Sequence, residues 1–135
     1  MTEEQRKIRI TILIVCVNLP IALLHFVTGR HYTGPFPGFV NGYLIDILLP
    51  FGFYFLLCPS EKKLKFLKPW YVKSALVFLA GSIVEMSQFF GIPIFGETFD
   101  PMDFVMYGLG GTLAAIFDTL LFPKIFKFWN PKTRG

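Results

Sequence analysis

Residues 70–90 read WYVKSALVFLAGSIVEMSQFF, an apolar stretch that carries one carboxylate, Glu85, and one lysine, Lys73. Its length is close to the roughly 20 residues that an α-helix needs to cross about 30 Å of hydrocarbon. Three further stretches, residues 8–28, 39–58 and 101–122, have a similar length and apolar character. The sequence therefore predicts an all-α polytopic membrane protein, a four-transmembrane-helix bundle that forms one domain over residues 1–135.

Basic residues are distributed unevenly around the four stretches. Only Arg30 lies in a loop at one end, and the other twelve of the 13 Lys and Arg residues lie at the opposite end: Arg6, Lys7, Arg9, Lys62, Lys63, Lys65, Lys68, Lys73, Lys124, Lys127, Lys132 and Arg134. Because Lys and Arg in short loops stay in the cytoplasm, we expect the N-terminus, the C-terminus and the middle link to be cytoplasmic. The two other loops would then face outward.

The composition supports a lipid environment. The chain is 53% hydrophobic and contains 17 Phe, which is more apolar surface than 135 residues can bury by themselves. The net charge of +4 is split among three segments that adjoin apolar stretches, which favours anionic lipid headgroups at about 1 kcal/mol per basic residue. We therefore expect membrane lipids as partners, and no nucleic acid and no cofactor.

Ionisable residues inside the apolar stretches are the strongest functional signal, because each costs roughly 2.5 to 3.5 kcal/mol at mid-membrane. Asp46 and Glu85 are predicted about 8 to 11 Å below the outer surface, counted along their helices. Gln88 shares a helix face with Glu85, three residues earlier. Together with other polar residues near the outer ends, these side chains predict one outward-facing acidic pocket that binds a ligand. Its residues would be Asp46, Glu85, Gln88, Asp103, Asn41 and His25.

Structural roles are the alternative for several of these residues. Asp100-Pro-Met-Asp103 has the pattern of a helix N-terminus, with Asp100 as the structural helix cap and Asp103 near the positive end of the helix dipole. Glu85 could instead hydrogen bond within the bundle, with Gln88, Ser82 or Ser87 as its partner. His25 could equally be a packing residue.

Two features of the last stretch favour structural roles. Its small residues, such as the pair Gly110 and Ala114, allow a close helix approach, and we expect packing within the bundle rather than dimerisation. Asp118 lies near the cytoplasmic end beside Lys124, so pairing with that lysine explains it, and we exclude it from the site.

The spacing of polar residues resembles the VanZ-like family of bacterial integral membrane proteins. The residues concerned are Val84-Glu85-Met86-Ser87-Gln88-Phe89, then Asp103 and Gly110, in the last third of the chain. Two positions depart from the family pattern, because Glu97 or Thr98 replaces a loop Arg and Tyr107 replaces an Asn. The resemblance implies a multi-pass protein of the bacterial inner membrane, in the cell envelope, and it implies no assigned activity.

Three functions remain open. The first is a binding protein whose acidic pocket holds a lipid-linked or amphipathic envelope ligand of the outer leaflet. The second is a proton-coupled carrier or membrane-embedded enzyme that uses Glu85 and Asp46, and the third is a small structural subunit of a larger membrane complex. The enzyme has the weaker case, since the chain has no nucleophile elbow, zinc-binding spacing or phosphate-binding loop. We expect no metal centre, although Asp46, Glu85 and Asp103 offer oxygen ligands of the type that Mg²⁺ or Ca²⁺ takes.

Overall fold

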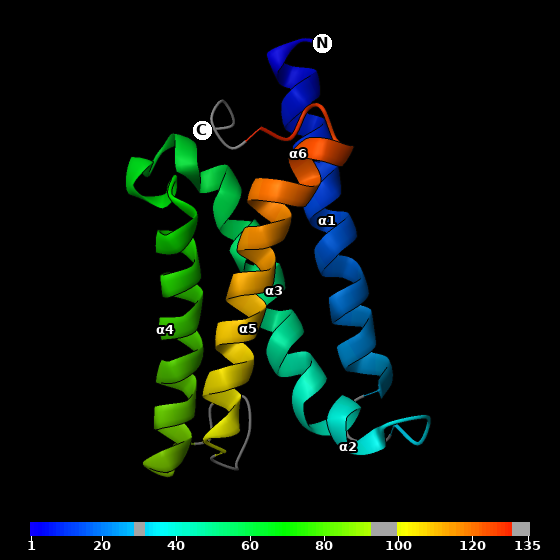
Figure 1. Ribbon diagram of the computed structural model, residues 1–135, viewed down its shortest axis with the longest axis vertical. Helices are drawn as coiled ribbons and strands as arrows, with labels where there is room; N and C mark the ends of the chain where they lie inside the picture. Colours follow the sequence, from blue (N-terminus) through cyan, green and yellow to red (C-terminus); the bar gives the residue numbers. More distant parts are fainter. Residues whose placement is uncertain (29–31, 93–99, 131–135) are drawn as a thin grey trace.

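Long helices form the described part of the protein (Figure 1). The computed structural model describes residues 1–28, 32–92 and 100–130, and within these ranges it contains helices and turns but no strand. The four helical segments long and apolar enough to cross a membrane are Glu3–Phe26, Pro37–Lys62, Trp70–Phe89 and Met102–Ile125. The predicted all-α class is therefore confirmed for the described residues, together with four helices that are long and apolar enough to cross a membrane.

The first helix, α1 (Glu3–Thr28), begins earlier than the predicted residue 8. Thr2 Oγ1 accepts a hydrogen bond from the Gln5 amide at 3.2 Å, and Gln5 Oε1 accepts one from the Thr2 amide at 3.0 Å. This reciprocal capping box satisfies two backbone donors, and Glu3 and Glu4 then occupy the first turn, where the helix dipole favours negative charge. Local capping therefore extends the helix beyond its apolar stretch.

Two of the spans change helix type along their length. The second consists of α2 (Pro37–Phe39), the π-helical turn η1 (Val40–Leu44), α3 (Ile45–Leu57) and the 3₁₀ turn η2 (Cys58–Lys62). The last consists of α5 (Met102–Ile116), the π-helical turn η4 (Phe117–Leu121) and α6 (Phe122–Ile125). The third span, α4 (Trp70–Phe89), is one uninterrupted helix that follows the short 3₁₀ turn η3 (Lys65–Leu67). Both π-helical turns carry polar residues, as such turns often do at functional sites.

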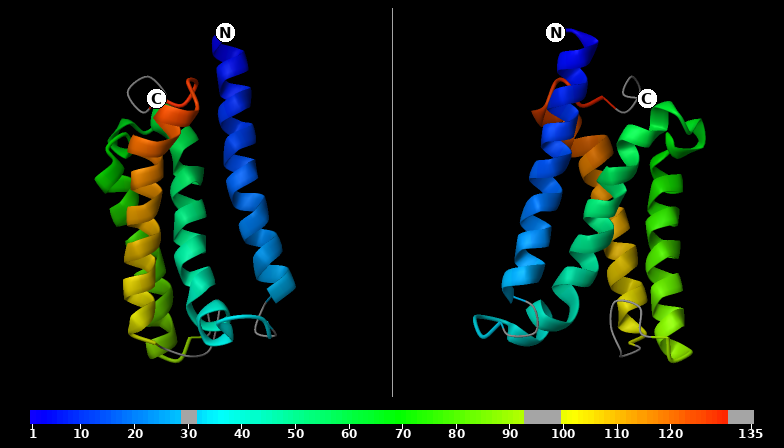
Figure 2. Two further views of the ribbon diagram at one scale, coloured as in Figure 1. Left: turned by 45° about the vertical axis from the view of Figure 1, so that its right-hand side comes forward. Right: turned by 180° about the vertical axis from the view of Figure 1, so that it is seen from behind.

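Helix α5 packs between α3 and α4, and α1 packs along the outer side of α3 (Figures 1 and 2). Glycines allow this closeness. A Cβ on Gly110 would lie 2.2 Å from the Ile47 carbonyl oxygen of α3, and one on Gly111 would lie 3.1 Å from a Val77 methyl of α4. The small residues of α5 therefore serve packing inside the bundle, as predicted.

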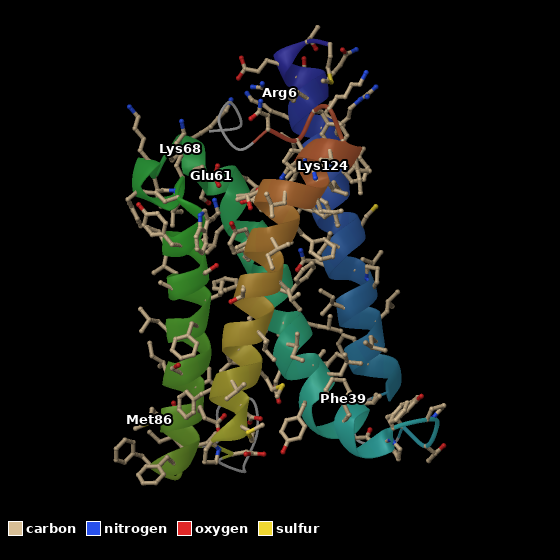
Figure 3. The ribbon with its side chains drawn as sticks, viewed as in Figure 1. Arg6, Phe39, Glu61, Lys68, Met86 and Lys124 are labelled. Carbon is tan, nitrogen blue, oxygen red and sulfur yellow. The ribbon has the colours of Figure 1, made fainter. Side chains whose placement is uncertain are left out.

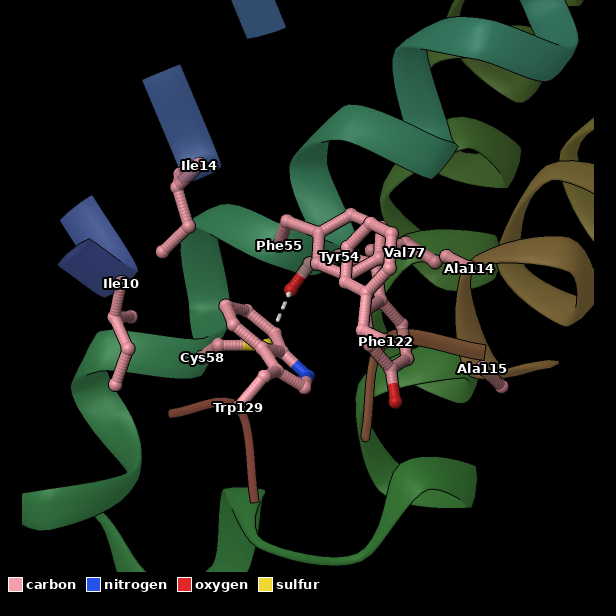
Figure 4. Packing of buried hydrophobic residues seen from close by; sticks show 10 residues of the cluster. All are labelled: Ile10, Ile14, Tyr54, Phe55, Cys58, Val77, Ala114, Ala115, Phe122 and Trp129. Carbon is pink, nitrogen blue, oxygen red and sulfur yellow. Dashed lines mark hydrogen bonds between the residues drawn. The ribbon is translucent and has the colours of Figure 1, made fainter. Parts of the chain in front are cut away.

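The packed core lies toward the end of the bundle that holds the N-terminus. Phe55, Phe122 and Trp129 form a ring cluster there, with centroid separations of 5.2 to 5.8 Å. Ile10 and Ile14 of α1 belong to the same core, and Figure 4 shows them with the aromatic rings. Burial of these side chains holds α1, α3 and the C-terminal segment together.

The basic residues gather at this same end of the bundle. Figure 3 shows Arg6, Lys68 and Lys124 there, whereas Phe39 and Met86 lie at the opposite end. We call the two ends the basic end and the acidic end. The basic residues that the sequence groups together therefore lie together at one end of the bundle.

Candidate functional site: an acidic layer

Four carboxylates from three parts of the chain meet at the acidic end. Asp46 lies in the first turn of α3, Glu85 in the last third of α4, and Asp103 in the first turn of α5, with Asp100 just before it. The side chains of Asp46 and Asp103 lie close to each other, and Glu85 lies within electrostatic range of both. We name these four residues the acidic layer. Asp46, Glu85 and Asp103, which the sequence places near one membrane depth, therefore also lie close together in space.

Glu85 is fully buried and fastens α4 to the start of α5. Its Oε1 accepts a hydrogen bond from the Asp100 amide at 2.6 Å, and its Oε2 accepts one from the Tyr107 hydroxyl at 3.3 Å. The alternative partners considered above, Ser82 and Ser87, do not bond it. Ser87 Oγ donates to the Ile83 carbonyl, and the buried Ser82 hydroxyl has no partner in the described part of the chain. Glu85 therefore positions the layer as well as adding charge to it.

Asp100 is held from two sides. Its Oδ1 accepts a hydrogen bond from the Met102 amide at 3.0 Å, as a capping side chain would, and α5 begins at Met102. Its Oδ2 accepts the Tyr43 hydroxyl, also at 3.0 Å. Because Tyr43 belongs to η1, this bond joins the second span to the entrance of the fourth. Asp100 is thereby fixed in place on the acidic layer.

Sequence reasoning missed the two tyrosines. Tyr107 is buried, and its ring lies against Gly81 of α4, where a Cβ would come within 2.6 Å of the ring. A glycine and an aromatic residue at matching depth on neighbouring helices are the signal that could have found Tyr107. Tyr43 follows Asn41 by two residues and precedes Asp46 by three. No pattern in the sequence indicates that Tyr43 belongs to the site, because the direction of its side chain depends on the π-helical turn η1.

Other predicted pocket residues have different roles or no described link to the layer. The Asn41 side chain bonds both the amide and the carbonyl of Tyr32, at 3.1 and 2.8 Å, and so holds the preceding loop instead of the carboxylates. His25 is exposed on α1, its ring meets Phe26, and it bonds none of the four carboxylates. Gln88 is partly buried one turn beyond Glu85, and its place in the site stays a prediction. The position near Glu97 and Thr98, where the VanZ-like pattern has an Arg, lies outside the described residues.

A second polar cluster, at the basic end, was not predicted. Lys73 is fully buried, bonds Glu61 and lies 3.6 Å from Asp118 Oδ2. Asp118 also accepts the Tyr54 hydroxyl at 2.6 Å and the Trp129 indole N–H at 2.9 Å. The expected pairing of Asp118 with Lys124 is therefore wrong, because η4 turns Asp118 inward toward α3 and α4. We name this cluster the basic-end network: Tyr54, Glu61, Lys73, Asp118 and Trp129.

Two carboxylates of the basic-end network form a set of potential metal ligands with the neighbouring Cys58. Ligand atoms of Cys58, Glu61 and Asp118 lie within 4.8 Å of one another, and all three residues are buried. The Lys73 ammonium group, however, contacts both carboxylates and takes the position of a cation. Cys58 Sγ lies 3.7 Å from the Tyr54 carbonyl. The geometry is that of a buried ion-pair network rather than a metal centre.

The fold and the two polar clusters define an all-helical, multi-pass membrane protein with ionisable groups near both ends of the bundle. No protein-family model, curated protein or solved structure matches the chain. Membership of the VanZ-like family therefore stays a prediction that rests on Glu85, Gln88, Asp103 and Gly110.

Proposed function

We propose that this protein is a VanZ-like protein of the bacterial inner membrane, with both termini in the cytoplasm and the acidic layer facing outward. The charge distribution supports this orientation. Basic residues such as Arg6, Lys68 and Lys124 gather at one end, and the carboxylates of the layer lie toward the other. Retention of Lys and Arg in the cytoplasm then directs the basic end inward.

The acidic layer would bind the head group of a lipid-linked or amphipathic molecule in the outer leaflet. The observation that carries this proposal is the meeting of Asp46 and Asp103 from two helices, with Glu85 and Asp100 beside them. Like charges gathered at a membrane depth cost free energy, and proteins keep such groups mainly where they serve a function. None of the four is paired with a described Lys or Arg.

The chemistry of the layer limits the head group. Ionised carboxylates accept hydrogen bonds and repel other anions, so the contacting part must offer hydroxyl or ammonium donors. Exposed apolar side chains adjoin the same end, including Phe39 at 45%, Phe89 at 59%, Phe90 at 71% and Met102 at 47% exposure. These would contact the apolar part of an amphipathic ligand. A donor-rich head group on a lipid tail fits both surfaces.

Retention of a copurifying molecule tests the binding proposal. Gently purified protein would be compared with Asp46→Asn and Asp103→Asn variants by native mass spectrometry. Glu85→Ala is a poorer probe, because it also removes the acceptors for the Asp100 amide and the Tyr107 hydroxyl. We expect a specific amphipathic molecule on the wild type and its loss from both variants.

Glu4→Gln is the matched control, since Glu4 is an exposed carboxylate at the basic end. It should retain the molecule. Equal retention in all four proteins would contradict the binding role, and no retained molecule in any of them would favour a structural subunit.

A proton-coupled carrier is the second candidate, and the proximity of Asp46 and Asp103 favours it. Two neighbouring carboxylates repel each other, and a proton on either one would relieve the repulsion, so the pair could take up and release a proton beside Glu85. Transport in proteoliposomes would then depend on pH, with a midpoint that moves in Glu85→Gln. Transport that does not change with pH would exclude this mechanism.

A further inference from the structure

The link between α3 and α4, residues 58–69, is a folded unit at the basic end. The Leu64 amide bonds the Ser60 carbonyl at 2.8 Å, and the Leu67 amide bonds the Leu64 carbonyl at 3.0 Å. Leu67 is only 2% exposed, and it anchors the turn η3 on the bundle. The side chains of the link are therefore presented from a fixed backbone rather than from a flexible tether.

Three lysines of this link are available for a partner. Lys63, Lys65 and Lys68 are exposed and form no ion pair within the described part of the chain. Neighbouring lysines differ, because Lys62 pairs with Glu3 at 2.5 Å and Lys73 is buried with Glu61 and Asp118. The link thus has three cations that internal carboxylates do not neutralise.

Apolar side chains alternate with these cations. Leu64 and Phe66 are 46% and 60% exposed, although both could have been polar at no cost to the core. Trp70 and Tyr71, which begin α4, are 50% and 59% exposed and pack edge to face. Trp and Tyr concentrate where a membrane meets water, so the link lies at the level of lipid headgroups.

We propose that the α3–α4 link is a docking surface for anionic phospholipid headgroups of the adjoining leaflet. Lys63, Lys65 and Lys68 would contact the lipid phosphates, while Leu64 and Phe66 enter the boundary of the acyl chains. An acidic soluble protein would satisfy the cations but would leave the apolar side chains without a hydrocarbon partner. The alternation of cations and apolar groups beside an aromatic belt fits a lipid surface.

Competition between an anionic and a zwitterionic phospholipid tests this proposal. The full chain in detergent would receive equal amounts of phosphatidylglycerol and phosphatidylcholine with matched acyl chains, and native mass spectrometry would count the bound molecules of each. We expect wild type to prefer phosphatidylglycerol, and the triple variant Lys63→Gln, Lys65→Gln, Lys68→Gln to lose at least about tenfold of that preference. The corresponding triple Arg variant should keep it.

The triple variant Arg6→Gln, Lys7→Gln, Arg9→Gln is the matched control, because it removes three positive charges from the same end of the protein. It should lower the lipid preference clearly less than the link variant does, because it leaves the exposed apolar side chains beside their cations in the link. An equal loss in the control would show that net charge alone attracts the lipid, and an unchanged preference in the link variant would place the lipid elsewhere. Either result would overturn the proposal. Unchanged unfolding midpoints would check that both variants are folded.

Discussion

The two polar clusters of this bundle differ in how their charges are balanced. In the basic-end network a buried Lys73 lies between two carboxylates, Glu61 and Asp118, and Asp118 also accepts hydrogen bonds from Tyr54 and Trp129. In the acidic layer, Asp46, Glu85 and their neighbours all have the same sign. A buried opposite charge holds elements together, whereas gathered like charges oppose the fold. From this difference we infer a structural role for the basic-end network and propose a functional role for the acidic layer.

Removal of Lys73 should have the largest effect on stability. Lys73→Met leaves Glu61 and Asp118 buried without their shared cation, and breaking a buried ion pair from one side costs about 3 to 5 kcal/mol. Thermal unfolding in detergent, followed by circular dichroism, would measure the loss. Lys68→Met is the control, because Lys68 is exposed. A Lys73→Met protein as stable as wild type would remove the structural role of the network.

A methyl group at Gly110 should have the next largest effect and should act on the acidic layer. Gly110→Ala would place a carbon atom 2.2 Å from the Ile47 carbonyl oxygen, so α3 and α5 must separate, at a cost of about 1 to 3 kcal/mol. Because these helices carry Asp46 and Asp103, ligand retention should fall as well.

Gly108→Ala is the matched control for Gly110→Ala. A Cβ at Gly108 would meet only the Phe78 ring, at 3.9 Å, which is an ordinary contact distance. Both stability and ligand retention should therefore stay close to wild type in this variant. Equal effects of the two substitutions would contradict the close α3–α5 contact.

The Trp129 indole should contribute a stabilisation of similar size to the close contact at Gly110. Trp129→Phe keeps a ring in the aromatic cluster but removes the hydrogen-bond donor to Asp118. Loss of a buried hydrogen bond to a charged group costs about 1.5 to 3 kcal/mol of unfolding free energy. The exposed Trp70 provides the comparison, since Trp70→Phe should change the unfolding midpoint little. If the two variants unfolded alike, the C-terminal segment would not be held by the network.

Neutralising Asp103 should have the smallest effect on stability. Asp103→Asn removes one of several neighbouring like charges, so we expect a change within about 0.5 kcal/mol or a small gain. Chemical denaturation of wild type and variant, side by side, would detect it. A large loss of unfolding free energy would mean that Asp103 stabilises the fold. The two clusters would then not differ in their roles.

The four spans could be predicted because length and apolar character suffice to define a membrane-crossing helix. Depth could be predicted too, since each residue adds a fixed rise along the helix, and this is why Asp46, Glu85 and Asp103 were placed at one level. Rotation about each helix axis could not, because packing sets it. The contact of Gly110 with Ile47 is an example, as no local pattern in either stretch specifies which faces meet.

The same limit explains the errors. Asp118 was assigned to Lys124 because the two are close in sequence, but the π-helical turn η4 rotates it toward Lys73 on another helix. Asn41 was assigned to the pocket from depth alone; its side chain bonds the Tyr32 backbone, and its place in the site stays a prediction. The early start of α1 was missed because the four stretches were bounded by apolar character, which does not include the polar capping box of Thr2 and Gln5.

A paired measurement on two aspartates tests the division of roles most directly. Asp118→Asn and Asp103→Asn make the same chemical change in the two clusters, and both stability in detergent and ligand retention by native mass spectrometry would be measured. We predict that Asp118→Asn lowers stability by about 3 kcal/mol, whereas Asp103→Asn leaves the bundle stable and loses the ligand. An Asp103→Asn protein that unfolds like Asp118→Asn, or that retains the ligand fully, would contradict the account.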